Sequence, residues 1–152
     1  MDSTLEKDRG LFYAVHELYR LMRRRFDDVA QPYDLTFPQW RALWQLYRKD
    51  GLSQSELAGL IDSDPMTLSG MMERLEAKGF VERRPAPTDS RAKIVLITDA
   101  ARDVVGNMKA EMVKAQQQAL TGIAEEDREQ LVRTMQRMSE NLGATFEKEI
   151  KE

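Results

Sequence analysis

Basic side chains are concentrated in one short segment near the middle of the chain. Between Arg83 and Lys93 the sequence holds four basic residues and one acidic residue, Asp89, whereas the net charge of the whole chain is −3 at pH 7. The acidic total argues against indiscriminate coating of DNA. A local basic patch on an acidic protein is instead typical of a surface that holds the backbone of a nucleic acid.

Runs rich in apolar residues flank this basic segment, so we expect a β-hairpin with a basic tip. The tip contains Pro85 and Pro87, followed by Asp89 and Arg91. The prolines stiffen the tip because their rings fix the backbone angle φ. Asp89 is close enough in sequence to orient the guanidinium of Arg91. A planar, permanently charged guanidinium suits a narrow, electronegative minor groove better than the ammonium of lysine does.

Two short helices are predicted immediately before this hairpin. Ser53 and Glu56 form a capping box that starts the first helix. After a polar break, Asp64 is a good N-cap and Pro65 suits the first position of the second helix. Gly79 ends that helix. Two short helices joined by a tight turn and followed by a hairpin predict a winged helix-turn-helix.

The outward side of the second short helix is the candidate base-reading surface. A helix enters the major groove, which is about 12 Å wide, if its leading side chains do not obstruct it. Ser69 and Gly70 keep the middle of this side small, although glycine costs about 1 kcal/mol in a helix interior. The first turn would meet base edges or phosphates, and Arg74 is placed one turn further along to reach phosphate. The alternative is an ordinary surface helix with a tolerated glycine.

Longer helices are predicted before the helix-turn-helix unit. Apolar residues recur every three or four positions over residues 5–30, and Pro32 ends that helix. Thr36 and Gln39 form another capping box, which starts the next helix.

Further helices are predicted after the hairpin, where Thr98 caps one helix and the last helix begins near Ala124. The first helix and the last ones carry more apolar surface than a small winged unit can cover. We therefore expect one mainly α domain with a small β-hairpin wing. Residues 36–97 would form its DNA-binding lobe, and residues 1–33 and 98–152 would form the helices of an obligate homodimer.

Composition excludes several classes of protein. The chain has no cysteine and only one histidine, which excludes disulfides, thiolate chemistry and zinc centres built on Cys or several His. No run of apolar residues is long enough to span a membrane, and the N-terminus lacks the apolar core of a secretory signal. We expect a cytoplasmic protein without membrane association, metal or cofactor.

Three segments taken together resemble the MarR family of bacterial transcription regulators. They are residues 52–58 (Leu-Ser-Gln-Ser-Glu-Leu-Ala), residues 72–83 (Met-Glu-Arg-Leu-Glu-Ala-Lys-Gly-Phe-Val-Glu-Arg) and residues 89–92 (Asp-Ser-Arg-Ala). The similarity extends over nearly the whole chain. One departure follows the hairpin, where the family often has Leu-Thr-x-x-Gly and residues 97–101 read Ile-Thr-Asp-Ala-Ala. The threonine that caps the helix is kept.

The resemblance implies a homodimeric winged helix-turn-helix repressor or activator on a palindromic promoter site. It assigns the minor-groove contact to Arg91 and its orientation to Asp89. The whole predicted set of DNA-binding residues is Pro65, Met66, Thr67, Ser69, Gly70, Arg74, Arg84, Asp89, Arg91 and Lys93.

The resemblance also implies a small effector, because members of the family commonly release DNA when an aromatic or phenolic molecule enters a cleft beside the DNA-binding lobe. Here His16, Arg20, Trp40 and Trp44 would line that cleft. In the alternative interpretation, the two tryptophans are core residues and His16 is a satisfied surface group.

Two other functions compete with DNA binding. A winged helix that binds another protein would have an apolar or acidic wing, whereas this wing carries Arg91. An enzyme would need a converging acid, base or nucleophile, and the sequence offers none. The carboxylates at residues 125–127 are explained by the dipole of the helix that they begin.

Overall fold

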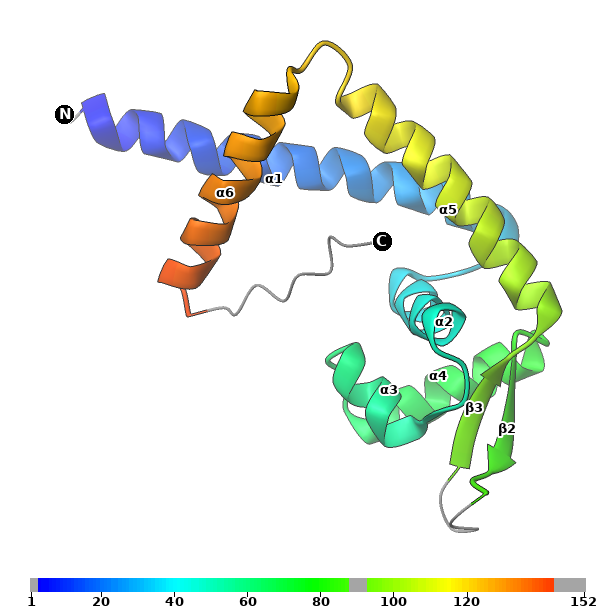
Figure 1. Cartoon of the computed structure of the whole chain (residues 1–152). Coiled ribbons are helices and arrows are strands. Elements are labelled where there is room, and N and C mark those ends of the chain that lie inside the picture. Colours follow the sequence, from blue (N-terminus) through cyan, green and yellow to red (C-terminus); the bar gives the residue numbers. More distant parts are fainter. Residues whose placement is uncertain (1–2, 88–92, 144–152) are drawn as a thin grey trace. The chain divides into compact units, whose positions relative to one another are not determined.

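A computed structural model describes residues 3–87 and 93–143 (Figure 1). Contacts divide the chain into two compact units, Met1–Ala115 and Gln116–Glu152. The larger unit contains the predicted winged helix-turn-helix, and its fold is mainly helical with a small antiparallel sheet, as the sequence predicted. The division of the chain into a DNA-binding lobe and dimerisation helices stays a prediction.

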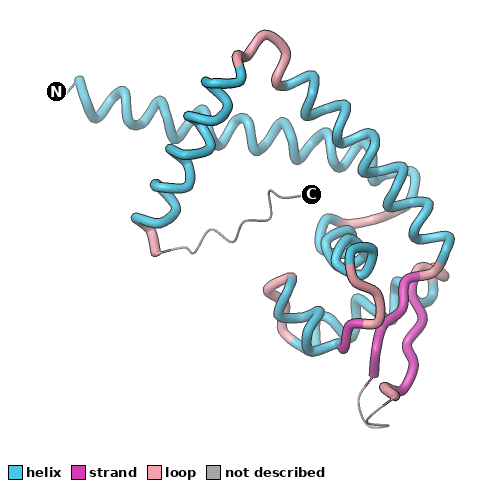
Figure 2. Tube along the Cα trace, in the orientation of Figure 1, coloured by secondary structure: helices cyan, strands magenta, loops and turns pink. Residues whose placement is uncertain are grey.

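Apart from a 3-10 turn and a two-residue strand that were not predicted, the helices and strands follow one another in the predicted order (Figure 2). They are α1 (Ser3–Ala30), the 3-10 turn η1 (Gln31–Tyr33), α2 (Phe37–Arg48), β1 (Leu52–Ser53), α3 (Gln54–Leu60), α4 (Pro65–Ala77), β2 (Val81–Pro85), β3 (Lys93–Ile97), α5 (Asp99–Ala119) and α6 (Glu125–Asn141). None of the helices in the described ranges is both long and apolar enough to cross a membrane.

The predicted helix caps are confirmed. The Thr36 backbone N–H donates to Gln39 Oε1 at 3.0 Å, and the Gln39 N–H donates back to Thr36 Oγ1 at 3.4 Å. Ser53 and Glu56 form the same reciprocal pair, with distances of 2.8 and 3.2 Å. The carboxylate of Asp64 accepts from two backbone N–H groups in the first turn of α4. Local hydrogen bonds therefore determine where α2, α3 and α4 begin.

The sheet has one strand more than the predicted hairpin. Its order is β1-β3-β2, with Val81 opposite Ile97 in the hairpin and Leu52 opposite Val95 in the added pairing. The short strand β1 was not predicted, because it has only two residues and Ser53 was interpreted only as a helix cap. Its pairing with β3 anchors the wing to the start of α3.

One hydrophobic core holds the winged unit together. Leu68, Met72 and Leu75 on α4 are fully buried, as are Val95 on β3 and Met108 on α5. Burying side chains of this size stabilises the fold by about 1.5–3 kcal/mol each. The core therefore fixes which side of α4 faces the solvent.

The N-terminal part of α1 exposes a large apolar surface. Its exposed residues include Leu11, Phe12, Tyr13, Leu18, Tyr19 and Leu21. In the smaller unit, α6 has no buried residue, and Leu131 and Val132 are among its exposed apolar side chains. Each unit, taken by itself, therefore exposes apolar side chains along one helix.

Candidate nucleic-acid interface

The outward face of α4 has the composition that the sequence predicted. Pro65, Met66, Thr67 and Arg74 are exposed, and Ser69 and Gly70 are half-buried. The structure thus brings the six predicted residues of this helix together on one side, opposite the buried stripe. The first turn of α4 is therefore exposed, and the middle of the same side carries only small side chains that would not obstruct entry into a groove.

Asp64 fixes the first turn of α4 and gives its end a negative charge. Its Oδ1 atom accepts from the backbone N–H groups of Met66 at 3.1 Å and Thr67 at 2.9 Å. Hydrogen bonding from the side chain and backbone of Thr67 lowers the pKa of Asp64 below its ordinary value. The ionised carboxylate occupies the N–H groups that would otherwise favour a phosphate at a helix start. This first turn is therefore better suited to base edges than to the DNA backbone.

The described part of the wing presents two of its predicted basic residues. Arg84 on β2 is exposed and forms an ion pair with Glu82, while Lys93 on β3 is exposed opposite Pro85. Asp89 and Arg91 lie outside the described residues, so their DNA contacts stay a prediction.

Arg83 links β2 of the wing to α4. Its Nη2 and Nε atoms lie 2.7 and 2.9 Å from Glu76 Oε2, and its backbone N–H donates to Glu76 Oε1 at 3.0 Å. The Arg83 side chain is only 16% exposed. Hydrogen bonding from its side chain is the largest cause of a lowered pKa at Glu76. These bonds hold β2 against α4, so the two elements that would contact DNA form one rigid piece.

This role of Arg83 was not predicted from the sequence. The residue was counted with the basic patch of the wing, although most of its side chain is buried against α4. The signal was present, because Glu76 and Arg83 flank the turn at Gly79, where a positive φ of 74° reverses the chain. A tight turn brings the residues on its two sides close together, so an acidic and a basic residue placed there can form an ion pair.

Asp50 joins three elements behind the wing. Its Oδ1 atom accepts from the Gly51 and Ile97 backbone N–H groups, each at 2.9 Å, and its Oδ2 accepts from Arg102 Nη2 at 2.7 Å. The end of α2, the end of β3 and the start of α5 are thereby tied together. A shift of α5 would therefore act directly on the base of the wing.

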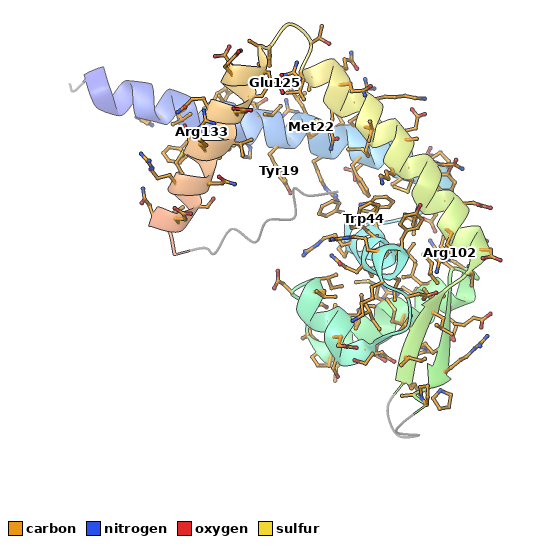
Figure 3. All side chains as sticks on the ribbon, viewed as in Figure 1. Tyr19, Met22, Trp44, Arg102, Glu125 and Arg133 are labelled. Atoms are coloured by element: carbon orange, nitrogen blue, oxygen red, sulfur yellow. The ribbon has the colours of Figure 1, made fainter. Side chains whose placement is uncertain are left out.

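The predicted effector residues are partly brought together. Trp40 and Trp44 stack with ring centroids 5.8 Å apart, and Trp44 lies between α2 and α5 (Figure 3), with Lys109 Nζ 5.4 Å from its ring. Arg20 pairs with Glu17 on its own helix at 2.8 Å, and His16 is exposed. The indoles are half-buried and pack against the core, which is compatible with both the core and the ligand interpretation.

Together, the helix pair, the basic hairpin and the connection between them define a winged helix-turn-helix protein. Residues 35–93 match the model of the MarR family. The predicted resemblance is confirmed over these residues, and the winged helix-turn-helix part of the chain is of the MarR type. Members of this family are transcription regulators and not enzymes.

Solved structures of other proteins share this fold. The MepR–DNA complex of Staphylococcus aureus is 24% identical, with 85% of this chain and 96% of that chain covered and a TM-score of 0.74. The YusO protein of Bacillus subtilis is 19% identical, with coverage of 91% and 99% and a TM-score of 0.74. A MarR-family regulator from Silicibacter pomeroyi is 24% identical, with coverage of 90% for both chains and a TM-score of 0.67. At these identities the likeness shows the fold.

Proposed function

We propose that this protein is a sequence-specific DNA-binding transcription regulator that acts in the cytoplasm as a homodimer on a pseudo-palindromic operator. The observation that carries the proposal is the connection of α4 to β2 through the ion pair of Arg83 with Glu76, together with the exposed first turn at the other end of α4. Because the two elements keep one orientation, α4 can lie in the major groove while the wing reaches the backbone and the adjacent minor groove.

Electrostatics assigns separate roles to the two elements. Arg74, Arg84 and Lys93 are exposed and provide positive charge toward phosphates. The first turn of α4 carries no basic side chain and would supply base contacts. Affinity should therefore fall steeply with salt, because each phosphate contact releases a counterion.

The exposed apolar residues of α1 and α6 support the homodimer. Burying apolar surface contributes about 25 cal/mol per Å², so a second copy of the chain is the most favourable cover for these helices. Leu18→Glu would place a charge in the proposed interface, while Leu60→Glu makes the same change at an equally exposed position of α3, outside the predicted dimerisation helices, as the control. Sedimentation at micromolar concentration should find dimers of the wild type and control and a shift toward monomer for Leu18→Glu. A folded wild-type monomer would contradict the proposal.

Selection from a random pool of duplexes tests whether the protein recognises a two-fold related DNA sequence. The wild-type protein should enrich a two-fold related sequence from a random pool of duplexes, with half-site centres separated by about 10 bp or a multiple of it. Hydroxyl-radical footprinting should then protect both half-sites. Enrichment of no sequence would favour the alternative, a winged helix that binds another protein, and a single asymmetric footprint would contradict the two-fold arrangement.

An aromatic or phenolic effector is a finer part of the proposal, supported by the half-exposed row of Trp40 and Trp44. An anionic aromatic molecule would stack on an indole and pair with a basic group such as Lys109 or Arg20. It would release DNA only as far as it prefers the state that does not bind DNA. Titration of tryptophan fluorescence and operator binding with a panel of phenolic acids tests this, and no change in either would contradict it.

A further inference from the structure

Met66 is a long apolar side chain in an exposed place. It is 85% exposed, whereas the core-facing residues of the same helix, among them Leu68 and Leu75, are at most 8% exposed. An isolated exposed apolar residue needs no explanation on most surfaces. This one stands in the first turn of the helix that the proposed function places in the major groove.

The position of Met66 on α4 is well determined by its surroundings. An α-helix turns by about 100° per residue, so Met66 lies about half a turn from both Leu68 and Leu75 and faces away from the core. Its backbone N–H is held by the Asp64 cap at 3.1 Å. On the same side, Ser69 and Gly70 follow one turn later, and a Cβ atom added at Gly70 would meet nothing within 4 Å. Met66 therefore projects from a part of the surface where the neighbouring side chains of Ser69 and Gly70 are small.

The chemistry of Met66 limits what it can recognise. A thioether has no hydrogen-bond donor and is only a weak acceptor, and the Asp64 carboxylate beside it disfavours a phosphate. In the major groove, the apolar group offered by a base is the C5 methyl of thymine. The helix α4 also contains no Asn or Gln, the side chains that read adenine through paired hydrogen bonds.

We propose that Met66 determines sequence specificity by packing against the C5 methyl group of a thymine in each half-site. The inference rests on the proposed function, because it requires α4 in the major groove. The operator should then contain a thymine that the protein recognises through its C5 methyl group and not through its hydrogen-bonding groups.

The test exchanges single methyl groups on the DNA. The duplex selected by the wild-type protein from a random pool is synthesised with each dT replaced in turn by dU, which removes only the C5 methyl. A dU in one half-site should weaken wild-type binding by about fourfold, and a dU at the same position of both half-sites by about 15-fold, as expected for losing one buried methyl group at each. Replacement of dT outside the footprint is the control on the DNA.

Variants of Met66 then attribute the effect to its side chain. Met66→Ala should bind the dT and dU duplexes equally, because its side chain no longer reaches the methyl, whereas Met66→Leu should keep most of the discrimination. Circular dichroism should be unchanged in both variants, since the side chain is exposed.

Three results would overturn the inference while leaving the proposed function intact. They are equal binding of every dU duplex by the wild type, the same loss with dU in Met66→Ala as in the wild type, and a selected half-site without thymine. If the wild type enriches no sequence at all, the proposed function itself fails, and the inference fails with it.

Discussion

Gly70 allows the proposed groove-binding role of α4 to be separated from the stability of the helix. It lies in the interior of α4 (Pro65–Ala77), where a Cβ would meet nothing within 4 Å. Gly70→Ala therefore introduces no clash in the free protein. A binding defect of this variant would have to arise in the complex with DNA.

The effect on stability follows from helix propensity. Glycine is less favourable than alanine by about 0.5–1 kcal/mol in the interior of a helix. Gly70→Ala should raise the free energy of unfolding by that amount, and each kcal/mol raises the Tm by about 2–4 °C for a protein of 150–250 residues. Gly106→Ala is a matched control, because Gly106 lies inside α5 and is equally open.

The effect on DNA binding should have the opposite sign. If the middle of α4 approaches the bases closely, an added methyl group weakens binding and a leucine weakens it further. Overpacking a close interface costs about 1–3 kcal/mol, so Gly70→Leu should lose about 5- to 150-fold in affinity. Gly106→Ala should gain stability without losing affinity.

Thermal unfolding at fixed protein concentration and fluorescence anisotropy with the selected duplex measure the two quantities separately. A Gly70→Leu variant that is folded and binds DNA like the wild type would refute the placement of α4 in the groove. A loss of Tm in Gly70→Ala would refute the claim that this site is open.

Three further predictions concern single side chains. Asp64→Ala should lower the free energy of unfolding by about 1 kcal/mol through loss of the N-cap, whereas Asp64→Asn should retain most of it; thermal melts check this. Because the folded pKa of Glu76 is lowered, its ion pair with Arg83 stabilises the protein above the unfolded pKa of about 4.3 and is lost as the pH falls through the folded value. Glu76→Gln should remove this part of the acid dependence in unfolding curves measured from pH 7 to 3, and an unchanged pH profile would contradict it. Arg91→Ala should cost about 1–3 kcal/mol of DNA binding per subunit and reduce the salt slope by about one unit for each phosphate that the variant no longer touches, with an unchanged Tm; wild-type affinity and salt slope would mean that the wing tip does not contact DNA.

Local signals in the sequence predicted most of the winged unit. Thr36, Ser53 and Asp64 each start a helix through hydrogen bonds to residues two or three positions away. The start of each helix can therefore be predicted from a stretch of about four residues. The apolar stripe of α4 likewise predicted its buried side, because helical periodicity fixes which residues share a face.

The features that sequence reasoning missed depend on contacts between separate elements. Strand β1 exists because Leu52 meets Val95, 43 positions later in the chain. The ion pair of Lys78 with Asp34 joins the end of α4 to the turn before α2. No local sequence pattern predicts this pair, because its two residues are far apart in the chain. Arg83 was recognised as basic, but its pairing with Glu76 across the turn at Gly79 was not inferred, so its role in holding β2 against α4 was missed. The contacts of His16, Arg20 and the two tryptophans with an effector stay a prediction.

The position of β2 in the sheet has a consequence for solubility. In the order β1-β3-β2, no strand pairs with the outer edge of β2 within the described sheet, and only the Arg83 N–H on this edge is given a partner, Glu76 Oε1. An edge without a neighbouring strand is a template for strands of other chains. Glu82, Arg84 and Pro85 protect this edge, since exposed charges and a residue without an N–H disfavour an added strand. The charges that suit the wing to phosphates therefore also keep separate molecules from joining through their sheets. A wing in which Arg84 and Pro85 are replaced by valine should be prone to aggregation even before any DNA is offered to it.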